Sequence, residues 1–253
     1  MAVTIKSERE IRLMREAGKI LGEIYDKIGE QIKPGMSTLE IDQIGEKMIL
    51  EANCIPECKG YEGFPNAFCV SVNEAVVHGI PNKDFILKEG DIVTLDTVLS
   101  HEGYMADAAR TFAVGEISED DRALIDNTRA AFYEGLKHAV AGNHLFEISK
   151  AVQDYAEGCG YGVIRDLVGH GIGKDMHEDP EVPNFKPIGR GMKLRKGMTI
   201  CIEPMIARGD YEIWVLDDEW TCVTRDGSRA AHHENTVLIT DGEPEILTPG
   251  ATA

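Results

Sequence analysis

The amino-acid sequence predicts an α+β fold in which two related halves form one curved antiparallel sheet covered by helices. Three observations support this prediction: segments that recur at a constant separation, helical patterns that open each half, and β-rich runs that follow each helical pair. Gly and Asn punctuate these runs, and no Pro/Ser-rich linker divides the chain. We therefore expect one domain over residues 1–253, with halves at about 7–117 and 118–246 related by a pseudo-twofold axis.

Length and composition exclude several classes of protein. The 253 residues are 43% hydrophobic and 28% charged, which is ordinary for a globular chain that can bury a substantial core. No apolar run approaches the roughly 20 residues that cross a bilayer, so we expect no membrane role. The net charge of −18 argues against direct nucleic-acid binding, which needs clustered Lys and Arg. Six irregularly spaced cysteines indicate reduced thiols and a cytoplasmic location rather than a disulfide framework.

The internal repeat is carried by two pairs of segments with one separation. IKPGMSTLEID resembles AVAGNHLFEIS, and LKEGDIVTLD resembles LRKGMTICIE. The second pair aligns Asp96 with Glu203, which are 107 residues apart. Asp107 and Glu234 extend the pattern, because each lies eight residues before a glycine. The two halves therefore place acidic residues at two sets of equivalent positions.

Each half is predicted to begin with two helices. SEREIRLMREAGKILGEIYDKI carries the capping-box pair Ser7 and Glu10, followed by apolar residues at helical spacing. A second helix is expected to start at Ser37, which has a glutamate three residues later. The second half repeats this order, with helices near 118–140 and 144–157.

The β-rich runs DIVTLDTVL, MTICIEPMI and ENTVLIT contain the acidic residues. Alternate residues of a strand share a face, so the apolar neighbours Val93 and Ile202 point into the core while Asp96 and Glu203 point away from it. Buried carboxylates are costly unless they are paired, protonated or bound to a metal. Each could pair with an arginine or cap a turn, but Arg and Lys are scarce in these segments. Four carboxylates meeting at the axis would repel one another unless cations neutralise them.

Histidines near these runs complete a candidate metal site. The glycine-rich stretch VGHGIGKDMHEDP contains His170 and His177, and taken alone it is compatible with metal ligands, catalytic groups or ordinary loop histidines. Four carboxylates with one or two histidines suit Mn, Fe, Co or Zn. Bridging carboxylates would hold two such ions about 3.5–4 Å apart, as in two-metal hydrolases.

The ordered set of motifs resembles that of the type I methionine aminopeptidases. The matching stretches include HGIP, GHGIG, MHEDP, IEPM and WTCVTRDGSRAAHHENTV, and the resemblance runs from about residue 4 to 246. It implies the pita-bread fold of the creatinase–aminopeptidase class, in its minimal bacterial-like form. It also implies five metal ligands at Asp96, Asp107, His170, Glu203 and Glu234.

The resemblance implies removal of the initiator methionine from nascent proteins when the second residue is small. Two divalent ions (Co, Mn, Fe or Zn) would activate a bridging hydroxide that attacks the first peptide bond. Glu203 would pass the proton to the leaving amine, and His177 would polarise the scissile carbonyl. His78 matches the other histidine that this family places near that bond. The implied walls of the methionine pocket are Cys58, Tyr61, Phe64, Cys69, Met176 and Trp220, although such residues are also common in plain cores.

The sequence departs from the family pattern at several positions. Met176 replaces a frequent aromatic residue, and Phe64 replaces a frequent tyrosine. Relatives usually have Gln and an aromatic residue before the last ligand, where this chain has His232 and His233. On a strand His232 would share a face with Glu234, so it is either a partner of the metal site or a packing histidine.

Two competing functions remain at this point. One is an X-Pro aminopeptidase or dipeptidase of the same fold, which usually carries a separate N-terminal domain. The other is a pita-bread protein that has lost catalysis and binds peptides, although such proteins characteristically lack some ligands. We expect a monomer whose partner is the N-terminal methionine of nascent polypeptides, and transient contact with the ribosome stays open.

Overall fold

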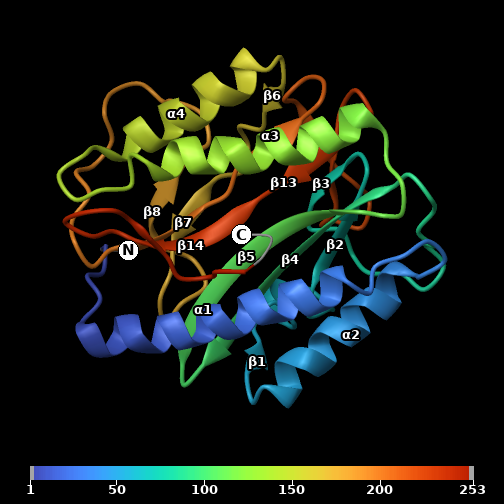
Figure 1. Ribbon diagram of the computed structural model, residues 1–253, viewed down its shortest axis with the longest axis horizontal. Helices are drawn as coiled ribbons and strands as arrows, with labels where there is room; N and C mark the ends of the chain where they lie inside the picture. Colours follow the sequence, from blue (N-terminus) through green and yellow to red (C-terminus); the bar gives the residue numbers. More distant parts are fainter. Residues whose placement is uncertain (1–2, 251–253) are drawn as a thin grey trace.

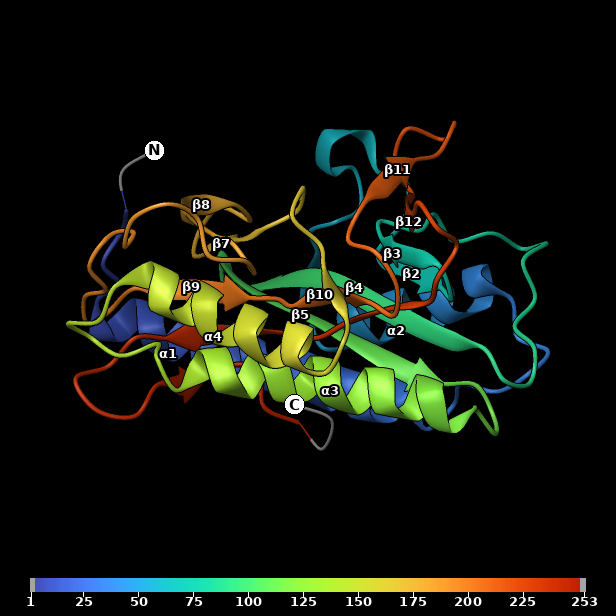
Figure 2. The ribbon, with the colours of Figure 1, turned by 90° about the horizontal axis from the view of Figure 1, so that it is seen from above.

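Four long helices cover one face of a curved sheet in the computed structural model, which describes residues 3–250 (Figures 1 and 2). The first pair lies over the first half of the chain's strands and the second pair over the second half. The helices are α1 (Glu8–Gly29), α2 (Thr38–Glu51), α3 (Glu119–Leu136) and α4 (Leu145–Gly158). The predicted α+β class is confirmed.

The main sheet is antiparallel and has nine strands, in the order β1-β4-β5-β14-β9-β7-β8, with β2 on β4 and β15 on β14. Its strands are β1 (Ile55–Pro56), β2 (Cys69–Val72), β4 (Ile92–His101), β5 (Tyr104–Ala113), β7 (Gly169–Gly171), β8 (Glu178–Val182), β9 (Thr199–Ile202), β14 (Glu234–Leu238) and β15 (Glu245–Ile246). Two three-stranded sheets contain β6 (Gly162–Val163), β10 (Met205–Ala207) and β13 (Ala230–His232), and β3 (Ala75–Val77), β11 (Ile213–Val215) and β12 (Cys222–Thr224).

The predicted helix starts are confirmed by their caps. The Ser7 side chain and Glu10 form a reciprocal capping box at α1, and the Ser37 hydroxyl accepts a hydrogen bond from the Glu40 N–H at α2. The third helix ends at Leu136 rather than near residue 140, where the chain turns towards Gly142 at φ 100°. Among the described residues, no helix is long and apolar enough to cross a membrane.

The two halves meet where β5 pairs with β14. The register places Ala109 of β5 opposite both Asp96 of β4 and Glu234 of β14. Asp96 and Glu234 therefore flank β5 from its two neighbouring strands, and Asp107 lies on β5 itself. On the helix-facing side, Val93 and Ile202 lie in separate buried clusters, as the alternation predicted. The acidic residues consequently lie on the face that the helices do not cover.

One predicted run is interrupted. MTICIEPMI was expected to be a single β-rich segment, but it divides into β9 and β10, which belong to different sheets. Glu203 and Pro204 lie in the break. Because proline has no N–H to donate to a ladder, the chain leaves the main sheet here, and the Glu203 carboxylate reaches the uncovered face.

Close packing of α1 against the C-terminal segment leads to a stability prediction. An ideal Cβ at Gly18 would lie 1.9 Å from the Leu247 carbonyl oxygen, whereas one at Gly158 of α4 would meet nothing within 4 Å. Gly18→Ala should therefore lower the free energy of unfolding by about 1–3 kcal/mol through overpacking. Gly158→Ala, at the exposed last residue of α4, is the control and should change it by less than about 0.5 kcal/mol. Urea unfolding midpoints measure both changes, and equal midpoints would contradict the packing argument.

Candidate metal centre and active-site pocket

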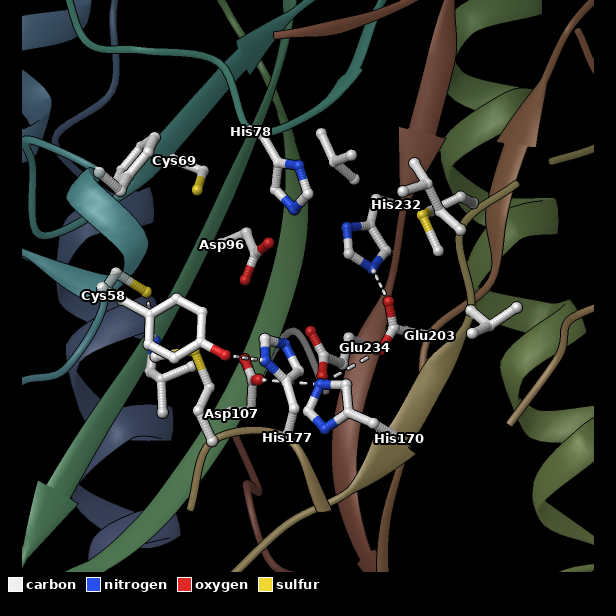
Figure 3. A pocket seen from close by; sticks show the side chains of 18 of the residues that line it. Cys58, Cys69, His78, Asp96, Asp107, His170, His177, Glu203, His232 and Glu234 are labelled. Carbon is white, nitrogen blue, oxygen red and sulfur yellow. Dashed lines mark hydrogen bonds and ion pairs between the residues drawn. The ribbon is translucent and has the colours of Figure 1, made fainter. Parts of the chain in front are cut away.

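A pocket of about 340 Å³ lies on the face of the sheet that the helices do not cover (Figure 3). Around it lie the short helix η1 (Tyr61–Gly63), strands β7 and β8, and the β11–β12 hairpin (Figure 2). Every site residue predicted from the sequence lines this pocket. They are Asp96, Asp107, His170, Glu203, Glu234, His78, His177, Cys58, Tyr61, Phe64, Cys69, Met176 and Trp220.

The acidic residues and His170 converge at the floor of the pocket. His170 Nε2 lies 3.5 Å from Asp107 Oδ2 and 3.6 Å from Glu203 Oε1. Potential ligand atoms of Asp107, His170 and Glu234 all lie within 4.8 Å of one another. Asp96 lines the same pocket from β4, outside this tightest group. Figure 3 shows all five side chains directed into one space.

These carboxylates have no cationic side chain to neutralise them. Between residues 3 and 250, no Lys or Arg forms an ion pair with them, which removes the alternative of arginine pairing. Oxygen atoms of Asp107, Glu203 and Glu234 are buried without a hydrogen-bond partner. Burial, followed by repulsion from Asp107, raises the pKa of Asp96, Glu203 and Glu234. Unpartnered oxygens grouped around an imidazole fit a divalent cation, which would supply the missing positive charge.

The geometry of His170 suits a metal ligand. Its Nδ1 lies 2.9 Å from the Gly171 carbonyl oxygen, which can only accept, so Nδ1 carries the proton. The Nε2 lone pair therefore faces the carboxylates, as in metal-binding histidines oriented by a backbone carbonyl. An ideal Cβ at Gly169 would lie 2.4 Å from the Cys201 carbonyl oxygen, so glycine is required for this close approach.

Cys201 is a site residue that the sequence interpretation did not identify. Its Sγ belongs to the same 4.8 Å group as Asp107, His170 and Glu234, and its side chain is fully buried. Burial and the neighbouring carboxylates raise the pKa of this thiol well above its ordinary value, so it is neutral in the absence of a metal. The sequence feature that could have identified Cys201 is its position two residues before Glu203, which places both side chains on the same face of a strand.

The two other predicted histidines, His177 and His78, line the same pocket as the carboxylates and His170. His177 Nδ1 is 2.8 Å from the Tyr61 hydroxyl, and its ring meets that of His170 edge-on at a centroid distance of 4.4 Å. Burial lowers the pKa of His177 to about 4 and also lowers that of His78, so both rings are neutral at pH 7. His78 has a left-handed φ of 59°, a conformation that is strained for a non-glycine residue and is concentrated at functional sites.

The remaining wall of the pocket is apolar and rich in sulfur. Phe64 and Trp220 meet edge-on at 5.1 Å, and Trp220 also lies beside the His78 ring. Cys58, Cys69 and Met176 belong to the same buried cluster as Phe64. These residues thus belong to the buried core and also line the pocket. Their role in binding a methionine side chain stays a prediction.

His232 and His233 have different surroundings. His232 is 1% exposed and lines the pocket, and its Nε2 lies 3.9 Å from Glu203 Oε2. His233 packs against Phe132 of α3 at a ring distance of 5.2 Å and is a packing histidine.

Comparisons with known proteins agree with this geometry. The model of metallopeptidase family M24 matches residues 12–241. The methionine aminopeptidase of Clostridium acetobutylicum is 52% identical over 246 residues, covering 97% of this chain and 98% of that protein. Methionine aminopeptidase 1 of Bacillus subtilis is 45% identical, covering 97% and 99%.

Solved structures show the same relationship. The crystal structure of the Thermotoga maritima methionine aminopeptidase superimposes with a TM-score of 0.95 at 42% identity, covering 98% of this chain and 99% of that one. An X-Pro aminopeptidase from the same species has a TM-score of 0.76 at 22% identity, and the match covers 98% of this chain but 63% of that one. At that identity the likeness concerns the fold alone.

Proposed function

The chain belongs to metallopeptidase family M24, and from this premise we propose that it is a metal-dependent methionine aminopeptidase that removes the initiator methionine of nascent polypeptides. One observation carries the proposal: a single pocket joins the group of carboxylates and His170 to an apolar wall of thiols and aromatic rings. The second substrate residue is proposed to be small. The cytoplasm is the proposed compartment, since the six cysteines are free thiols.

The ligand set proposed for two divalent ions comprises Asp96, Asp107, His170, Glu203 and Glu234. These donors suit Mn, Fe, Co or Zn. When bound, such ions supply Lewis acidity to the scissile carbonyl and lower the pKa of the attacking water. The buried, unpartnered oxygens of Asp107, Glu203 and Glu234 support this assignment.

Glu203 is proposed as the proton carrier of the reaction. Its carboxylate would accept a proton from the attacking water and donate it to the nitrogen of the leaving amine as the peptide bond breaks. The products are free methionine and a peptide shortened by one residue. The position of Glu203 supports this role, because its carboxylate lines the pocket and its buried Oε1 has no hydrogen-bond partner among residues 3–250.

His177 is proposed to stabilise the oxygen of the scissile carbonyl. If the Tyr61 hydroxyl donates to Nδ1, the neutral ring carries its proton on Nε2. That N–H could then donate to the carbonyl oxygen as negative charge develops on it. His78 is proposed to bind the same peptide group from the opposite wall.

Specificity for methionine is attributed to the apolar wall. Phe64 and Trp220 line the pocket with aromatic rings, and a thioether beside a ring gains roughly 0.3–1.5 kcal/mol. The substrate's free amino group would lie among the carboxylates, which restricts cleavage to the first peptide bond. An X-Pro peptidase is the competing candidate because it shares the fold.

Removal and return of metal, combined with three peptides, tests this function. The protein is stripped with a chelator, Mn²⁺ or Co²⁺ is added back, and cleavage of Met-Ala-Ser, Leu-Ala-Ser and Ala-Pro-Ala is followed. We expect release of methionine only, and only when metal is present. Preference for Ala-Pro-Ala would reassign the chain to the X-Pro enzymes. Absence of cleavage by a folded, metal-loaded protein would favour a peptide-binding protein.

A further inference from the structure

The backbone of His232 is held firmly beside the metal centre. The Thr111 hydroxyl of β5 accepts the His232 N–H and donates to the His232 carbonyl oxygen, both at 3.0 Å. The Thr94 hydroxyl, 2.8 Å away, can donate to Thr111 and complete its hydrogen bonding. Because β13 ends at this residue, the ring points from the end of a strand into the pocket (Figure 3).

The His232 ring is buried, and its polar atoms are unsatisfied. Neither Nδ1 nor Nε2 has a hydrogen-bond partner within residues 3–250, although the side chain is 1% exposed. Buried polar atoms in folded proteins nearly always have a hydrogen-bond partner, so two unpaired ring nitrogens call for an explanation. The carboxylate nearest to Nε2 is that of Glu203, at 3.9 Å.

Glu203 lies between two imidazole rings. Its Oε1 is 3.6 Å from His170 Nε2, and its Oε2 is 3.9 Å from His232 Nε2. A small rotation of the carboxylate that moves Oε2 by about 1 Å would bring it within ordinary N–H···O distance of His232 Nε2. Oε1 would then remain directed to the space beside His170.

We propose that His232 is a positioning residue that donates a hydrogen bond from Nε2–H to Glu203 Oε2 and so orients Oε1 towards the metal ions. This role rests on the proposed metal-dependent function. An ionised carboxylate only accepts hydrogen bonds, so Nε2 of His232 must carry a proton. Hydrogen-bonding partners of metal ligands typically contribute about 10–100-fold to metal affinity.

The burial of the ring agrees with this assignment. The His232 side chain is 1% exposed, and neither ring nitrogen has a hydrogen-bond partner among residues 3–250. Because this burial excludes water, a single well-aimed donor would be worth more here than at the surface.

The first test measures metal affinity by calorimetric titration of the stripped protein with Mn²⁺. His232→Leu, which fills similar space without a donor, should bind the metal about 10–100-fold more weakly. His232→Gln, whose amide N–H can replace the ring N–H, should recover most of the affinity. His233→Phe is the matched control and should bind as the wild type does. Wild-type affinity in His232→Leu would overturn the proposal.

The second test observes the proton directly by ¹⁵N NMR of the labelled wild-type protein, which is informative even if His232→Leu fails to fold. We expect the His232 signals of the Nε2–H tautomer with and without metal. The Nδ1–H tautomer would overturn the proposal, because Nε2 could then only accept. Neither readout uses peptide cleavage, so a failure of the methionine aminopeptidase assignment would be recognised separately by the peptide assay.

Discussion

Glu203→Gln should lower kcat for Met-Ala-Ser by about 10²–10⁴-fold, the range expected when a general acid–base group is lost. The amide has nearly the same shape as the carboxylate but cannot carry a proton from water to the leaving amine. The KM of the Glu203→Gln variant should change much less, because Glu203 is not part of the apolar wall proposed to bind the methionine side chain. The measurement is steady-state kinetics at saturating Mn²⁺.

Two controls separate proton transfer from loss of metal. Glu74→Gln, at an exposed glutamate four residues before His78, should retain wild-type kcat. Calorimetric titration of Glu203→Gln then defines the Mn²⁺ concentration that saturates it, so the loss of a ligand is compensated. If Glu203→Gln has nearly the wild-type kcat at saturating Mn²⁺, another residue must carry the proton.

The grouping of the carboxylates could be predicted in part from the sequence, because two periodicities act together. The constant separation aligned Asp96 with Glu203, and strand alternation placed both away from the apolar face. Both rules can be read without knowledge of the three-dimensional structure. The pairing of β5 with β14, which brings Asp107 and Glu234 together at the junction of the halves, is a long-range contact that only the structure shows.

The pocket walls were not predictable in this way. Tyr61 belongs to a short helix, and Trp220 lies just before β12, 159 residues later. Such loop residues have no periodicity, so only the resemblance to a family identified them. Cys201 was missed for a different reason, since a thiol on an apolar strand is usually an ordinary core residue.

The breaks between sheets were also missed. The chain leaves the main sheet at Pro204 and rejoins it at Glu234, with His233 between β13 and β14. The runs IEPM and HHENT read as continuous strands because their composition does not change at the break. These breaks nevertheless bring Glu203, which follows β9 of the main sheet, close to His232, which ends β13 of a three-stranded sheet.

His177→Ala should lower kcat by about 10²–10³-fold, the usual effect of removing one donor from a developing oxyanion. Truncation of this ring leaves the charge on the carbonyl oxygen without its N–H partner, while the apolar wall remains intact. The loss should therefore appear in kcat rather than in KM, measured with Met-Ala-Ser at saturating Mn²⁺. A loss confined to KM would assign His177 to substrate binding alone.

Tyr61 provides the test of how His177 is oriented. Its hydroxyl lies 2.8 Å from Nδ1, and by donating to Nδ1 it would select the ring tautomer that donates from Nε2. Tyr61→Phe should therefore cost about 0.5–1.5 kcal/mol in the barrier, the net value of one hydrogen bond. In the His177→Ala background the same change should cost almost nothing, since Tyr61 would then have no ring to orient. Additive losses in the double variant would show instead that Tyr61 contacts the substrate independently of His177.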